Sequence, residues 1–209
     1  MIVKDAKERK QEILSVADRL FKTKGFDHTS ISDILDEVGI ARGTLYYHFK
    51  SKEDIMDSLI DSKTSTMISN AKRIAGNKSL PVLERFLLTI KSLNMGEDGH
   101  AGMIEFIHQP QNALINEKNQ KIVTKEIPPI LLSVVEDGIE EGIFQLDYPY
   151  EAIEMTIVYA NAVFGNEFAD LSGELQKKKI LAFIRNVEVM FGAKKGTFDS
   201  IIGSVLGEK

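Results

Sequence analysis

Apolar residues recur along most of the chain at spacings of three and four residues, the period of an amphipathic helix. No stretch of alternating apolar and polar residues bounded by turn signals predicts a strand. The pattern therefore predicts an all-α protein. The first helix should end at Gly25, a residue typical of the position just past a helix end, and its apolar face comprises Ile13, Leu14, Ala17, Leu20 and Phe21.

Two short helices are predicted next, separated by a turn of three residues. Ser30-Ile31-Ser32-Asp33 has the form of a capping box, and the apolar positions that follow it continue until Gly39. After the turn Gly39–Ala41, a third helix is expected from Arg42 to about Phe49. Ser51-Lys52-Glu53-Asp54 repeats the capping pattern and opens a long fourth helix.

A break at Gly76–Ser79 separates this small amino-terminal part from a larger helical one. Proline cannot lie deep inside a helix, so Pro128-Pro129 predicts that Ile127 leaves the helical region and that Pro128 opens a new helix. The helices predicted in the larger part cover residues 80–93, 103–108, 128–139, 150–168 and 174–191, followed by an amphipathic segment at 198–206.

The composition is that of a folded globular protein, with 43% hydrophobic and 27% charged residues among 209. No apolar run approaches the roughly 18 residues that span a bilayer, and the first residues are charged where a secretory signal is apolar. We therefore expect the protein in the cytoplasm. The chain has no cysteine, which excludes disulfides and thiolate metal sites.

Enzyme motifs are missing from the sequence. It has no nucleophile elbow, zinc-protease motif, phosphate-binding loop or dinucleotide fingerprint, so we do not expect an enzyme or a cofactor. His100, Glu105 and His108 do not have the spacing of a recognised metal site, so no metal is predicted.

Charge is distributed unevenly along the chain, whose formal net charge is −5. Residues 1–52 carry 10 Lys and Arg against 8 Asp and Glu, whereas the remaining residues carry 16 against 23. The segment 38–52 contains one Arg, two Lys, one His, two Tyr and no acidic residue. Residues 62–83 also lack acidic residues, so the arrangement of the side chains has to decide the function of 38–52.

Two short helices joined by a three-residue turn describe a helix-turn-helix motif, whose second helix enters the DNA major groove by its amino-terminal end. Arg42 can pair with guanine, Gly43 permits close approach, and Thr44 offers a hydroxyl and a methyl group to base edges. A plain solvated surface is the alternative. However, Arg42 lies at the positive end of its helix dipole, where folding alone favours an acidic residue.

The same residues resemble the DNA-binding domain of the TetR family of bacterial transcriptional regulators. The resemblance covers about the first 60 residues and rests on these positions in order: Ala17, Leu20-Phe21, Gly25-Phe26, Thr29-Ser30-Ile31, Asp33-Ile34, Gly39-Ile40, Gly43 to Phe49, and Ser51-Lys52-Glu53. It implies a DNA-binding domain at residues 1–54, a connecting helix at 55–78 and a ligand-binding and dimerisation domain at 79–209.

The resemblance also implies a homodimer that binds a palindromic operator, usually as a repressor released by a small molecule. A TetR-like activator or a ligand-independent regulator is the alternative. Ala41 departs from the family, which usually has a capping Ser there. Carried over by position, the residues near bases are Ser32, Arg42, Gly43, Thr44 and His48, and those near phosphates are Thr29, Ser30, Tyr46, Tyr47 and Lys52.

The carboxy-terminal part has no motif to transfer. The helices at 150–168 and 174–191 are apolar over more than one stripe, which favours a four-helix bundle with a second copy, burial within the chain being the alternative. A small-molecule cavity is expected between residues 80 and 168, although the same residues could simply fill the core. The candidate ligand-binding residues are Phe86, Met103, Phe106, His108, Tyr159 and Asn161.

Overall fold

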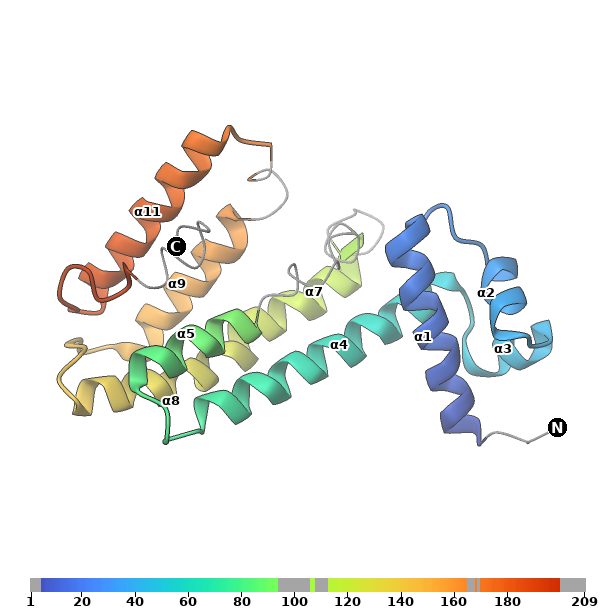
Figure 1. Cartoon of the computed structure of the whole chain (residues 1–209), viewed down its shortest axis with the longest axis horizontal. Coiled ribbons are helices and arrows are strands. Elements are labelled where there is room, and N and C mark those ends of the chain that lie inside the picture. The colour runs from blue at the N-terminus through green and yellow to red at the C-terminus, as the bar shows by residue number, and fades with distance from the viewer. Residues whose placement is uncertain (1–4, 94–105, 108–112, 165–167, 169, 200–209) are drawn as a thin grey trace. The chain divides into compact units, whose positions relative to one another are not determined.

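The computed structural model describes residues 5–93, 106–107, 113–164, 168 and 170–199 (Figure 1). None of these residues lies in a strand, which agrees with the predicted all-α fold. No helix among them is long and apolar enough to cross a membrane. The longer helical elements are α1 (Ala6–Lys24), α2 (Ile31–Val38), α3 (Arg42–His48), α4 (Lys52–Ala75), α5 (Val82–Ser92), α7 (Ala113–Lys121), the π-helix η2 (Ile122–Glu126), α8 (Ile127–Glu140), α9 (Pro149–Val163) and α11 (Gly173–Met190).

The described residues fall into two compact units, and the boundary between them lies inside α4, after Met67. The first unit holds α1, α2, α3 and the first part of α4, together with Phe106 and Ile107. The second holds the end of α4, α5 and the described residues from Glu117 onward. The domain limits predicted at residues 54 and 78 lie on either side of this boundary and stay predictions.

Local capping sets the ends of the first helices, as the sequence predicted. The Ser30 hydroxyl accepts a hydrogen bond from the Asp33 backbone N–H (3.1 Å), and the Asp33 carboxylate accepts one from the Ser30 backbone N–H (2.7 Å). Gly25 follows α1 with φ 84°, and Gly39 follows α2 with φ 70°, a left-handed conformation that glycine adopts without steric cost.

The core of the first unit forms around the apolar face of α1, whose Ile13 and Ala17 are completely buried. Phe26, just after α1, packs its ring edge-on against Phe21 (centroids 5.2 Å apart) and against Phe106 (4.5 Å). The other buried residues of this core are Leu14, Leu20, Ile34, Leu45, Phe49, Ile55, Met56, Leu59, Ile60 and Ile107.

In the second unit, α8 packs against both α5 and α9 and supplies much of the core. Four phenylalanines close the core beside it: Phe86, Phe144, Phe191 and Phe198, with Phe86 and Phe198 stacked at 5.5 Å. All four are at most 4% exposed. Phe198 therefore makes the turn after α11 part of this core.

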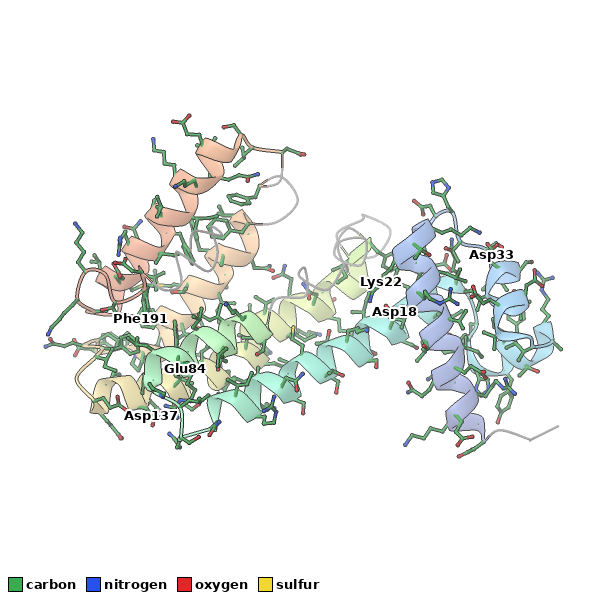
Figure 2. All side chains as sticks on the ribbon, viewed as in Figure 1. Asp18, Lys22, Asp33, Glu84, Asp137 and Phe191 are labelled. Atoms are coloured by element: carbon green, nitrogen blue, oxygen red, sulfur yellow. The ribbon has the colours of Figure 1, made fainter. Side chains whose placement is uncertain are left out.

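Two charged residues are buried in the second unit. Arg85 on α5 is 1% exposed and pairs with Asp137 on α8 (labelled in Figure 2), which also accepts from Lys78. Glu188 on α11 is 2% exposed, and its carboxylate accepts hydrogen bonds from the backbone N–H groups of Gly196 (3.0 Å) and Phe198 (2.9 Å). These contacts fasten α5 to α8, and the turn after α11 to α11 itself.

The prediction for Pro128-Pro129 was correct in part: the prolines lie in the first turn of a helix, α8, but Ile127 does not leave the helical region. Ile127 stays helical (φ −76°, ψ −45°), and its N–H donates to the carbonyl of Ile122, five residues back. The π-helical turn η2 thus joins α7 to α8 without a break, with the prolines in the first turn of α8. Such a wide turn accommodates residues that cannot continue the ordinary hydrogen-bond ladder.

The sequence did not predict α7 and η2. The helices that it predicted at 80–93, 128–139, 150–168 and 174–191 have the expected ends to within two residues, with one exception. α9 ends at Val163, and Phe164 has left the helical geometry (φ −98°, ψ 24°), whereas the sequence predicted a helix as far as residue 168. The predicted segment 103–108 is described only at Phe106 and Ile107, and the segment 198–206 only as far as residue 199.

Candidate nucleic-acid interface

The helix α3 is held in place by its apolar side. Leu45 is completely buried and Phe49, just after the helix, is 1% exposed. Gly39 ends α2, the Ile40 N–H donates to the Leu35 carbonyl (3.2 Å), and the chain is extended at Ala41 before α3 starts. As predicted, α3 begins at Arg42 without a side-chain cap at Ala41.

The other side of α3 is exposed. Tyr47 is 79% exposed and Tyr46 48%, and Arg42 and Gly43 are also exposed at the amino-terminal end. Apart from its chain neighbours and the backbone of its own helix, no atom of the described residues lies within 4 Å of the position that a Cβ on Gly43 would occupy, so they leave the helix open to approach there. This short helix therefore presents a cationic and aromatic surface around an unobstructed glycine.

Thr44 and His48 lie at the borders of this surface and are half-buried. The His48 ring packs edge-on against the Tyr47 ring, with centroids 4.9 Å apart. Because α3 holds both side chains between its exposed and buried sides, their polar atoms can face a partner while their apolar parts pack on the unit.

Ser30 and Ser32, at the start of α2, are exposed. The Asp33 carboxylate (labelled in Figure 2), which completes the capping box, pairs with Lys24 at 2.8 Å. Hydrogen bonds from the Lys24 ammonium and from Ser30 hold the pKa of Asp33 well below its ordinary value. Asp33 therefore stays ionised, and its carboxylate is engaged in capping α2 and in the pair with Lys24.

Thr29 differs from the other predicted contact residues. It is 1% exposed, its hydroxyl donates to the Gly25 carbonyl (2.8 Å), and its backbone N–H donates to the Phe26 carbonyl (3.2 Å). Neither group is left to bind a phosphate. The phosphate contact of Thr29 stays a prediction; in this structure its hydrogen bonds fix the loop between α1 and α2.

Lys52, the first residue of α4, is tied to the same loop. Its ammonium donates to the Phe26 carbonyl (2.7 Å) and lies 4.2 Å from the centroid of the Phe26 ring. One of its three N–H groups is therefore used within the chain, and the side chain is half-buried.

The predicted ligand-binding residues are not brought together in one place. Phe86 is part of the closed phenylalanine core of the second unit, whereas Phe106 packs against Phe26 in the first unit. Tyr159 is 51% exposed and stacks on Phe183 (5.5 Å), and Asn161 is half-buried. Met103 and His108 lie outside the described residues.

Sequence reasoning also missed the two buried charges. Arg85 had a recognisable signal, because it occupies the same helical face as Val82, Phe86 and Thr89, all buried, at spacings of three and four. Glu188 had none, since its partners are backbone N–H groups of a turn whose position only the fold determines.

An exposed helix with an arginine, a glycine and two tyrosines, held behind a tight turn by a buried leucine and phenylalanine, defines a helix-turn-helix DNA-binding protein. Comparison with known families agrees. Residues 13–59 match the model of the bacterial regulatory proteins of the tetR family, and residues 100–186 match a tetracyclin repressor-like carboxy-terminal domain. The chain belongs to the TetR family of transcriptional regulators, which are not enzymes.

Individual relatives agree with this assignment. The HTH-type transcriptional repressor KstR2 of Mycobacterium tuberculosis is 28% identical over 152 residues, which are 69% of this chain and 74% of that protein. An HTH-type transcriptional regulator of Staphylococcus aureus is 41% identical over 71 residues, 34% of this chain and 38% of that protein.

Solved structures share the fold. A putative TetR-family regulator from Mesorhizobium loti has a TM-score of 0.62 at 16% identity, covering 89% of this chain and 98% of that one. The SmeT–triclosan complex has a TM-score of 0.64 at 18% identity, covering 91% and 94%.

Proposed function

We propose that the protein is a homodimeric repressor that binds a palindromic operator through α3 and leaves it when a small molecule enters the second unit. The exposed face of α3 is the observation that carries the proposal. A tyrosine that is 79% exposed beside an exposed arginine contributes nothing to the core of the first unit, but both side chains suit DNA. One relative, KstR2, is a transcriptional repressor.

The geometry of the motif separates the proposed DNA contacts into those with base edges and those with phosphates. We assign the base edges to Arg42, Gly43 and Thr44 at the leading end of α3, with Ser32 and His48 beside them, because the amino-terminal end of a recognition helix enters the groove. We assign phosphates to Ser30, Tyr46, Tyr47 and Lys52. Lys52 would use the two N–H groups that it does not donate to Phe26.

A second copy would supply the symmetry that a palindrome requires. The exposed apolar residues of the second unit support dimerisation through α9 and α11, since Met155 is 66% exposed and Val189 80%. Two recognition helices about 34–36 Å apart would then enter successive turns of the major groove on one face of the duplex.

The effector would bind in the second unit. We assign its walls to the described candidates of that unit, Phe86, Tyr159 and Asn161. Support comes from the shared fold of SmeT, whose structure is described as a complex with triclosan.

DNA recognition is tested by selecting random duplexes with the purified protein and measuring affinity for the enriched sequence. We expect an inverted repeat, and we expect Arg42→Ala to lose about 1–3 kcal/mol of preference for that sequence. Lys72→Ala removes a charge from an exposed position of α4 and serves as the control. Failure to enrich any sequence, or equal effects of both substitutions, would refute the assignment of α3.

Phosphate contact and release have separate tests. Lys52→Ala should weaken binding to all duplexes alike. It should also reduce the slope of log affinity against log salt concentration by about 1, the effect of losing one phosphate contact. Release is tested by adding small apolar molecules, triclosan among them, to the complex and following fluorescence anisotropy. A molecule that binds the protein saturably but leaves operator affinity unchanged would contradict the repressor-release mechanism for that molecule.

A further inference from the structure

One side of α9 is exposed and mainly apolar. Met155 is 66% exposed, Val158 47% and Tyr159 51%, and Ala162 is exposed as well. The spacings of three and four residues place them in a single stripe along the helix, on the side away from the buried Ile153. The stripe continues toward the amino-terminal end of the helix with an exposed carboxylate, Glu151.

A matching stripe runs along α11, opposite its buried residues Ile184 and Val187. Leu175 is 39% exposed and Val189 80%, and Ala182 lies midway between them at intervals of seven residues. Exposed polar residues complete this stripe, with two lysines near the amino-terminal end and an asparagine further along: Lys178, Lys179 and Asn186.

The two stripes belong to one surface of the second unit. Tyr159, at the edge of the α9 stripe, stacks on Phe183 of α11 with ring centroids 5.5 Å apart and an angle of 10°. The surface therefore combines two exposed apolar helix faces. The α9 stripe carries the acidic Glu151, and the α11 stripe carries Lys178 and Lys179, with the exposed Glu174 in the first turn of α11. Among the described residues, neither Glu151 nor Lys178 has an ion-pair partner.

The positions of the charges distinguish two ways of packing α9 against α11 of a second copy. When the helices run parallel, with a constant offset of 27 in residue number, Glu151 faces Lys178, and an alanine faces a larger side chain at two positions, Met155 with Ala182 and Ala162 with Val189. The pairs are Tyr148 with Leu175, Glu151 with Lys178, Met155 with Ala182, Tyr159 with Asn186, and Ala162 with Val189.

The antiparallel arrangement that keeps Met155 opposite Ala182 fits the charges less well. It places Lys178 opposite Tyr159 and leaves Glu151 opposite Asn186, so that neither charge meets its opposite. Charges across an interface select its register chiefly because mismatched pairs are unfavourable.

We propose that, in the dimer, α9 of one protomer lies parallel to α11 of its partner, with Glu151 against the partner's Lys178. This inference rests on the proposed dimer and specifies its register. Because α9 and α11 run in opposite directions within a protomer (Figure 1), the two copies of α9 would then be antiparallel to each other.

The absence of cysteine in the chain permits a direct test by disulfide cross-linking. Glu151→Cys is co-expressed with a Lys178→Cys chain of different length, and Tyr159→Cys is co-expressed with the same partner. A covalent heterodimer from the first pair and none from the second is expected. The reverse result would overturn the parallel register but leave the dimer intact.

Charge reversal gives an independent readout. Glu151→Lys should weaken the dimer about tenfold or more at low salt, because it places like charges together, and Lys178→Glu in the same chain should restore it. Glu136→Lys, at an exposed position of α8, makes the same charge change outside the two stripes and is the control. Equal dimer affinity of Glu151→Lys and the unsubstituted protein would overturn the ion pair. A monomeric unsubstituted protein in sedimentation experiments would instead refute the dimer itself.

Discussion

Gly138 occupies the closest approach of α8 to the phenylalanine core, and alanine there should destabilise the second unit. A Cβ at Gly138 would lie 2.3 Å from Cδ2 and 2.5 Å from Cε2 of Phe144, and 3.2 Å from Val82. The Phe144 ring is 2% exposed and packs against Phe86, Phe191 and Phe198. These side chains leave the ring no room to move away from an added Cβ.

Two opposing effects set the magnitude for Gly138→Ala. Overpacking a closed core costs about 1–3 kcal/mol, and the contact with Phe144 is short enough to favour the upper half of that range. Replacing glycine by alanine inside a helix stabilises the folded state by about 1 kcal/mol, because alanine has the higher helix propensity. We therefore expect a net loss of about 1–2 kcal/mol, which lowers the Tm of a chain of this length by several degrees.

A double-mutant cycle with Phe144→Val isolates the contact. Valine lacks both ring atoms that clash, so Gly138→Ala should change sign in that background and stabilise by up to about 1 kcal/mol. Unfolding is followed by circular dichroism at 222 nm during urea titration. If Gly138→Ala stabilises the unsubstituted protein, or destabilises both backgrounds equally, the close approach does not limit the packing of α8.

Three further predictions concern other parts of the chain. Ala41→Ser should stabilise the protein by about 1 kcal/mol in thermal unfolding, because α3 has no side-chain cap; no gain would mean that the helix begins elsewhere. Thr29→Val should cost about 1 kcal/mol through the lost hydroxyl bonds but leave operator affinity of the folded protein unchanged, and a selective loss of affinity would support the phosphate contact. Hydrogen bonds from Lys78 and Arg85 lower the pKa of Asp137, so its stabilisation is complete above the ordinary carboxyl pKa and disappears as pH falls through the lower, folded pKa. Asp137→Asn should therefore flatten the acid side of a urea-midpoint profile measured between pH 3 and 7, and an unchanged profile would contradict this role.

The amino-terminal unit was predictable because its determinants are local. A capping box at Ser30, a left-handed glycine at Gly39 and the apolar spacing of α1 each involve residues within a few positions of one another, and each specifies a boundary independently. Thr29 escaped prediction for the opposite reason. Its burial depends on where the loop after α1 folds back, and a polar residue in a loop gives no sequence signal of burial.

The second unit was harder to predict because its arrangement depends on distant residues. The pattern placed Phe86 and Phe106 in one region of sequence, but packing assigns them to different cores. The break expected at Pro128 failed because a π-helical turn accommodated the prolines while keeping the chain helical. Both outcomes are decided by tertiary contacts, whereas capping and periodicity describe only neighbours along the chain.

The surplus of apolar residues in α9 and α11 is nevertheless informative when sequence and structure are combined. The sequence indicates helices that need burial on two sides, and the fold buries only one: Ile153, Ile184 and Val187 face the core, whereas Met155 and Val189 remain exposed. Isolated exposed apolar residues are common, but these lie in stripes with helical spacing on consecutive helices. Exposed apolar stripes do not stabilise a single chain. The second apolar side of each helix therefore favours burial against a partner with helices of the same kind, which a second copy of this chain provides.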